Sequence, residues 1–159
     1  MPEQETLRRV RQDEAEGKSP SVQAGEFVRE EIHHVREGKH GARSAKQAIA
    51  IGLSKARRAG VKLPQPDPVR TSKATLKKAK SDSEEGRHPH KPSTKRSRAT
   101  MNALKREGHQ SASSKALSRQ ATSGAAKRTH KERSAASKKA AKTRAREKSW
   151  SHAAASRVR

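Results

Sequence analysis

Basic side chains carry the clearest chemistry in this sequence, because lysine and arginine bind phosphate oxygens. They recur as adjacent pairs, for example Lys105-Arg106 and Lys138-Lys139. Neutralising phosphates releases condensed counterions, which gives affinity for nucleic acid without any contact to a base. The predicted phosphate-binding residues are Lys95, Arg96, Arg98, Lys105, Arg106, Lys127, Arg128, Lys138, Lys139, Lys142, Arg144 and Arg146, with a secondary set of Lys46, Lys55, Arg57 and Arg58.

The eight histidines are the other candidates for chemistry. His33, His34 and His40 lie close in sequence, and two more flank Pro89. Adjacent residues on a helix point about 100° apart, so His33 and His34 do not readily share one metal ion. No recognised zinc-ligand spacing is present, and the chain has no cysteine. The sequence therefore predicts surface histidines and no metal site.

Signatures of catalysis are missing from the sequence. It contains no phosphate-binding glycine loop, no dinucleotide-binding glycine motif and no nucleophile motif. Its few carboxylates, such as Glu26 and Glu30, alternate with arginines in a pattern typical of ion pairs on a helix surface. We therefore predict a non-enzymatic protein without a cofactor.

The positive charge is large and unevenly distributed. The chain has 39 lysines and arginines against 16 acidic residues, a net charge of +23 over 159 residues. Residues 91–159 hold 20 basic and 3 acidic residues, a net charge of +17. Such a polycation binds nucleic acid as the commonest cellular polyanion. Phosphate binding is therefore assigned mainly to the C-terminal part.

The apolar content is too low for an extended core. Only 28% of the residues are hydrophobic, against about 45–50% in a typical globular domain. No apolar run approaches the roughly 20 residues of a membrane helix, so no membrane association is expected. The predicted fold class is mostly α with extensive disorder, in which a small helical hairpin precedes a low-complexity basic tail with marginal helices.

Local signals place the hairpin at residues 20–63. Apolar residues recur every three or four positions over 24–35, which predicts a first helix from Pro20 to about Gly38. Ser44 begins a Ser-x-x-Gln capping box, and the second helix is expected to end near Gly60.

The remaining segments carry weaker signals. Residues 1–19 predict a weak N-terminal helix. Residues 64–94 predict a Pro-rich and polar linker, with a short helix from Ser72 to Leu76 and a loop over 81–94. Residues 95–159 form the basic tail, with marginal helices expected at 95–107, 113–122 and 131–148.

Two resemblances add to this interpretation. Lysine, arginine, alanine and serine make up most of the tail, whose composition resembles that of linker-histone tails and of bacterial histone-like proteins. The stretches AGEFVREEIHH (24–34) and SAKQAIAIGLSKARRAG (44–60) resemble an uncharacterised bacterial family of small basic proteins. The second resemblance implies a bacterial source and a short helical module, and it supplies no catalytic residues.

Three functional hypotheses follow. The leading one is sequence-nonspecific binding of nucleic acid by a histone-like, nucleoid-associated cytoplasmic protein. Only Phe27 and Trp150 are aromatic, so base stacking is scarce and duplex DNA is favoured. A helix-turn-helix reader is disfavoured, because the loop between the two helices is long for that motif. The alternatives are a module at 20–63 that binds a protein partner or itself, localised by the tail, and an RNA- or ribosome-associated protein.

Overall fold

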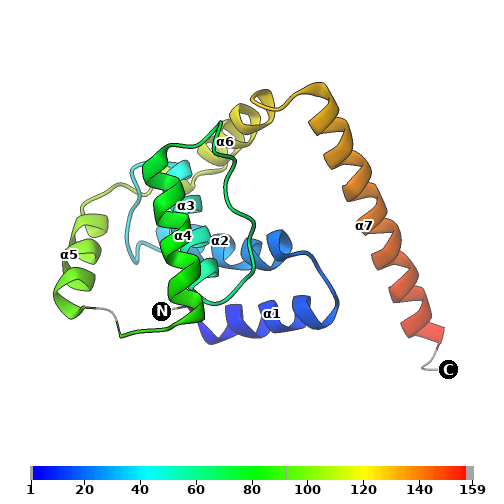
Figure 1. Cartoon of the computed structure of the whole chain (residues 1–159), viewed down its shortest axis with the longest axis horizontal. Coiled ribbons are helices and arrows are strands. Elements are labelled where there is room, and N and C mark those ends of the chain that lie inside the picture. Colours follow the sequence, from blue (N-terminus) through cyan, green and yellow to red (C-terminus); the bar gives the residue numbers. More distant parts are fainter. Residues whose placement is uncertain (1, 92, 157–159) are drawn as a thin grey trace. The chain divides into compact units, whose positions relative to one another are not determined.

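The computed structural model describes the backbone of residues 2–91 and 93–156, and the side chains of those residues up to residue 145. Within these ranges every regular element is a helix and no strand occurs, which confirms the predicted mostly helical class. None of the described helices is long and apolar enough to cross a membrane. They are α1 (Gln4–Ala15), α2 (Pro20–Arg36), α3 (Ala45–Arg58), α4 (Lys73–Arg87), α5 (Thr94–Lys105), the 3₁₀ turn η1 (Gln110–Ala112), α6 (Ser114–Ala126) and α7 (His130–Ser156) (Figure 1).

The chain divides after Leu117 into two compact units. The first holds α1 to α5 and η1, together with the start of α6. The second holds the rest of α6 and α7. The buried apolar clusters lie in the first unit. The packing of this unit therefore determines where its ionisable and metal-ligating side chains are placed.

The core of the first unit lies between α2 and α3 and consists of two small clusters. In one cluster, Phe27 at the N-terminal half of α2 packs with Ala56 at the C-terminal end of α3. In the other, Val35 near the end of α2 packs with Ala48 near the start of α3. The two helices therefore pack against each other in an antiparallel arrangement. Phe27 and Val35 have no exposed surface, and α1 adds Leu7 to the first cluster.

Gly52 marks the closest approach of α2 and α3. A Cβ atom added at Gly52 would lie 2.7 Å from the Cα atom of Val28. The obstacle is backbone, which cannot move aside without separating the helices. Gly25, also inside a helix, is exposed and has no atom within 4 Å of the corresponding position.

These two glycines are expected to respond in opposite ways to alanine. Gly52→Ala lowers the free energy of unfolding by about 1–3 kcal/mol, because the added methyl group overpacks the helix contact. Gly25→Ala raises it by about 0.5–1 kcal/mol, because alanine favours the helix. Urea denaturation followed by circular dichroism measures both. Equal effects of the two substitutions would contradict the close helix contact.

The predicted loop over 81–94 is wrong in its first half, because α4 continues to Arg87. Ser72 caps the helix as expected and accepts a hydrogen bond from the Thr75 amide. Asp82 then anchors it, since this almost fully buried carboxylate accepts hydrogen bonds from Ser54 Oγ at 2.7 Å and from Lys78 Nζ at 2.6 Å. A polar residue typical of a loop thus holds the helix against α3.

The compact unit also extends beyond the predicted hairpin. The amide of Gly41 donates to the carbonyl of Leu104 at 3.0 Å, and that of Ala42 donates to the carbonyl of Gly108 at 3.1 Å. Arg36 Nε donates to the carbonyl of Ala112 at 2.9 Å. These hydrogen bonds attach the last turn of α5 and the chain after it to the end of α2 and to the loop that follows α2.

Candidate functional site

The predicted phosphate-binding side chains fall in three places. One group lies on α5 and the residue after it, a second lies in the turn between α6 and α7, and a third lies on α7. Arg146 belongs to α7, but its side chain lies outside the described residues. The other eleven are all exposed, and the structure records no ion pair for any of them among the residues it describes: Lys95, Arg96, Arg98, Lys105, Arg106, Lys127, Arg128, Lys138, Lys139, Lys142 and Arg144.

On α5 the basic residues gather on one face. Lys95, Arg98 and Lys105 are separated by three and then seven residues, which brings them onto the same side of a helix with 3.6 residues per turn. Arg96 projects about 100° away from Lys95 and nearly opposite to Arg98 and Lys105. The helix therefore presents a row of cations along its length.

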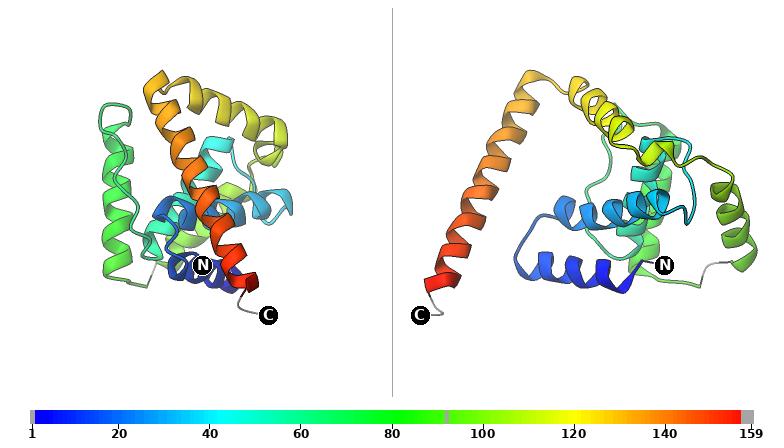
Figure 2. Two further views of the ribbon diagram at one scale, coloured as in Figure 1. Left: turned by 90° about the vertical axis from the view of Figure 1, so that its right-hand side faces the viewer. Right: turned by 180° about the vertical axis from the view of Figure 1, so that it is seen from behind.

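On α7 the basic residues surround the helix. Lys138 and Lys142 share one side, while Arg144 follows two residues later and projects from nearly the opposite side. The described side chains of α7 include alanines but no larger apolar residue, so they form no face suited to packing in a core. Figure 2 shows α7 as a single uninterrupted helix. The described part of α7 is therefore a helix with basic side chains on several sides and no apolar face.

The secondary set on α3 behaves differently. Only Lys46 is exposed and has no recorded ion pair in the described part of the chain. Lys55 extends inward to buried carboxylates, and buried Arg57 donates to the carbonyl of Pro64 at 3.3 Å. Arg58 forms an ion pair with Asp82 at 3.7 Å. The placement of Lys55 and Arg57 does not support phosphate contacts from these two residues.

Lys55 is the centre of a buried ion cluster. Its Nζ lies 3.1 Å from Glu30 Oε1 and 2.7 Å from Glu31 Oε2, and both carboxylates are almost completely inaccessible to solvent. Burial alone would raise the pKa of Glu30. Hydrogen bonds from the Glu3 amide and the Thr6 side chain, with the charge of Lys55, outweigh burial and hold the pKa of Glu30 below its ordinary value. This cluster positions α1, α2 and α3 together.

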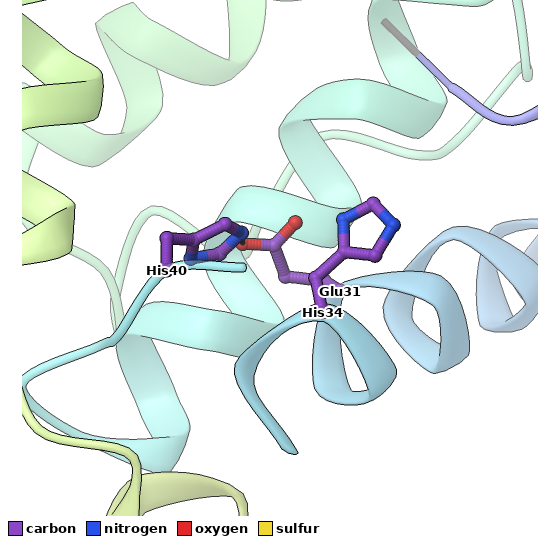
Figure 3. Close-up of side chains that lie close together, drawn as sticks. All are labelled: Glu31, His34 and His40. Atoms are coloured by element: carbon purple, nitrogen blue, oxygen red, sulfur yellow. Dashed lines mark ion pairs between the residues drawn. The ribbon is translucent and has the colours of Figure 1, made fainter. Parts of the chain in front are cut away.

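Two histidines lie beside this cluster, which contradicts the prediction that they are surface residues. His40 is buried, and only 13% of the His34 side chain is exposed. Figure 3 shows both rings next to the carboxylate of Glu31. Metal-ligating atoms of Glu31, His34 and His40 all lie within 4.8 Å of one another. His33, in contrast, is exposed, as its position on the helix predicts.

The sequence contained a partial signal for this arrangement. Glu31 and His34 are three residues apart, so they share one face of α2. His40 comes from the loop after α2, and Gly38 turns that loop back with a φ of 73°. The adjacent histidines His33 and His34 do not come together, whereas His34 and His40 do. Spacing alone does not show that the loop returns His40 to the helix face.

Glu3 completes the surroundings of His34 from the N-terminal segment. Its Oε1 lies 2.8 Å from His34 Nε2 and 2.9 Å from Lys39 Nζ. Hydrogen bonds from these two side chains lower the pKa of Glu3 from its ordinary value to about 2. The carboxylate is thus ionised at neutral pH and orients the His34 ring.

Comparison with known proteins adds a family match without a function. Residues 21–66 match the sequence model of a family of unknown function (DUF6496), which confirms the resemblance to an uncharacterised family. The match covers α2 and α3, including Glu31, His34, His40 and Lys55, and it ends before the basic residues of α5 to α7. No curated protein and no solved structure matches the chain.

Proposed function

We propose that this protein is a non-enzymatic, histone-like protein that binds nucleic acid, with duplex DNA favoured, without regard to sequence. The observation that carries the proposal is the difference between its two kinds of basic residue. Many cations before residue 90 are paired with carboxylates, as Lys18, Lys55 and Lys78 are. The eleven described tail residues named above are exposed without a recorded ion pair, so phosphate oxygens are their natural counterions.

The form of α7 supports a duplex as the partner. The major groove is about 12 Å wide and accepts an α-helix between two rows of phosphates. A helix with basic residues on opposite sides, such as Lys142 and Arg144, is able to reach both rows. The 27 residues of α7 span about 40 Å at 1.5 Å per residue, which is longer than one turn of DNA.

The side chains available argue against recognition of adenine and against stacking of bases on phenylalanine, tyrosine or tryptophan. Residues 130–145 of α7 contain no asparagine or glutamine, the residues that recognise adenine. Phe27 is fully buried, and the side chain of Trp150 lies outside the described residues. The described residues therefore offer no exposed phenylalanine, tyrosine or tryptophan for base stacking, which supports phosphate contacts with DNA over recognition of single-stranded RNA.

The helices of the second unit are proposed to depend on this binding. Their like charges repel one another, and α7 has no apolar face in its described part to compensate by packing. Phosphates would remove that repulsion and favour the helix. In a bacterial cell, such binding would place the protein at the nucleoid, in the cytoplasm.

Binding to unrelated duplexes at increasing salt tests the proposal. We expect similar affinities for DNA duplexes of different sequence, and a linear fall of log affinity with log salt concentration whose slope is about −0.9 for each phosphate neutralised. Fluorescence anisotropy between 50 and 300 mM salt measures both, with duplex and single-stranded RNA of equal length as competitors. A marked preference for one DNA sequence, a flat salt dependence or stronger binding to RNA would contradict the proposal.

A further inference from the structure

Glu31 is a buried carboxylate whose two oxygens lack a hydrogen-bond donor. It has no exposed surface, and neither oxygen accepts a hydrogen bond of acceptable geometry. Lys55 Nζ lies 2.7 Å from Oε2, and this contact provides charge compensation even though its angle is poor for a hydrogen bond. The one ion-pair partner recorded for Oε1 among the described side chains is His40 Nε2, at 3.4 Å. A buried carboxylate oxygen without a donor is costly, and a bound cation is one group that would satisfy it.

The hydrogen bond on the far side of His40 determines what its ring offers to Glu31. Nδ1 of His40 lies 3.1 Å from the carbonyl of Gly41, and a carbonyl only accepts, so Nδ1 carries the proton. The neutral ring then has a lone pair on Nε2, which faces Glu31 Oε1. In this neutral form two acceptors face each other across 3.4 Å.

His34, on α2, has a similar arrangement, in which one ring nitrogen has an acceptor as its partner and the other faces Glu31. Its Nε2 lies 2.8 Å from the ionised carboxylate of Glu3, so Nε2 carries the proton. Figure 3 shows the other ring nitrogen of His34 turned toward the Glu31 carboxylate. A metal-binding histidine usually donates its second ring proton to a carboxylate or a backbone carbonyl, and here one histidine has each.

We propose that Glu31, His34 and His40 bind a divalent transition-metal ion, with zinc as the best fit. Two neutral imidazoles and one carboxylate form a known three-ligand set for zinc, which leaves the fourth position to water. The three ligand atoms lie within 4.8 Å of one another, whereas the ligands of one zinc ion are about 3.3 Å apart. Binding therefore requires the rings to move inward.

The surrounding charges permit such an ion. Lys55 and Lys39 are the nearby cations, and the nearby carboxylates are Glu3, Glu30, Glu31 and Glu37, which leaves the cluster with two net negative charges. A bound ion would join α2, the loop after it and, through Glu3, the N-terminal segment. The role inferred for the metal is structural, and it is independent of the phosphate binding proposed above.

Zinc titration of the full chain, purified in the presence of a chelator that is then removed, tests the site. We expect one zinc ion to bind per chain in competition with a chromophoric chelator, and the thermal unfolding midpoint to rise. His34→Gln should weaken zinc binding by at least tenfold. His33→Gln is the matched control, because His33 is adjacent and exposed, and it should bind zinc as the original chain does.

Two results would overturn the metal site. One is the lack of any stoichiometric zinc binding at pH 7.5, which would mean that Lys55 compensates Glu31 without a metal ion. The other is equal zinc affinity in the His34→Gln and His33→Gln variants, which would place the ion at surface histidines. His34 is preferred to buried His40 for substitution because it is partly exposed, and circular dichroism verifies that the variant keeps its helices.

Discussion

Neutralising four basic residues on α7 is expected to lower DNA affinity at least tenfold near 150 mM salt. Removing four phosphate contacts also reduces the log–log salt slope by about 3–4, because each contact contributes about 0.9. The substitutions replace with glutamine the exposed residues Lys138, Lys139, Lys142 and Arg144. Fluorescence anisotropy with a labelled duplex of arbitrary sequence, repeated at several salt concentrations, measures the affinity and the slope.

A control variant with the same loss of charge separates local contacts from overall charge. It carries four lysine-to-glutamine substitutions in and before α4, where the side chains are equally exposed. We expect this variant to lose much less affinity and to keep most of the salt slope. An equal loss in both variants would show that the protein attracts DNA through its net charge alone and that α7 has no particular role. The control positions are Lys62, Lys73, Lys77 and Lys80.

Replacing Lys55 by methionine is expected to destabilise the first unit by about 3–5 kcal/mol. This is the cost of removing one partner from a buried ion pair, because Glu30 and Glu31 then remain buried without their cation. The core consists of a few small clusters, so a loss of this size should leave a large fraction unfolded at 25 °C. Urea denaturation in the presence of a chelator measures the change, and exposed Lys46→Met on the same helix should shift stability by less than about 0.5 kcal/mol.

The pH dependence identifies the cause. In the original chain the pKa of Glu30 is below its ordinary value, so its contribution to stability is present above that value and is lost as the pH falls. Without Lys55, burial should instead raise the pKa of Glu30, so the variant regains stability as Glu30 is protonated. The difference in stability between the two proteins should therefore shrink on acidification toward pH 4. A constant difference from pH 7 to pH 4 would contradict the electrostatic explanation.

Helix positions were predicted well wherever the signals are local. The Ser44 cap is present, and its Oγ accepts from the Gln47 amide at 3.2 Å, while the Gln47 side chain accepts from the Arg43 amide. The predicted helices over 95–107 and 131–148 correspond to α5 and α7. Apolar spacing, serine caps and glycine ends act within a few residues, so one sequence is sufficient to recognise them.

The misplaced elements depend on contacts between distant residues. The length of α4 depends on Asp82, whose partner Ser54 is 28 residues away. The burial of His40 depends on the loop that returns it to α2. Lys55 has the same appearance in the sequence as Lys46, and only the positions of Glu30 and Glu31 across the helix contact direct it inward. A basic residue on a helix is most often solvated, so the sequence favoured the wrong environment for Lys55.

The close backbone contacts of the first unit imply that this unit tolerates less sequence change than α7 does. Gly41, Gly52 and Gly86 lie where any side chain would collide with the backbone of another segment, so each position accepts only one residue type. In α7 no described side chain is fixed by a neighbour in a core, and exchanging an alanine with a lysine one position away keeps the same charge density. During divergence the first unit should therefore retain the order of its residues, whereas α7 needs to retain only their proportions.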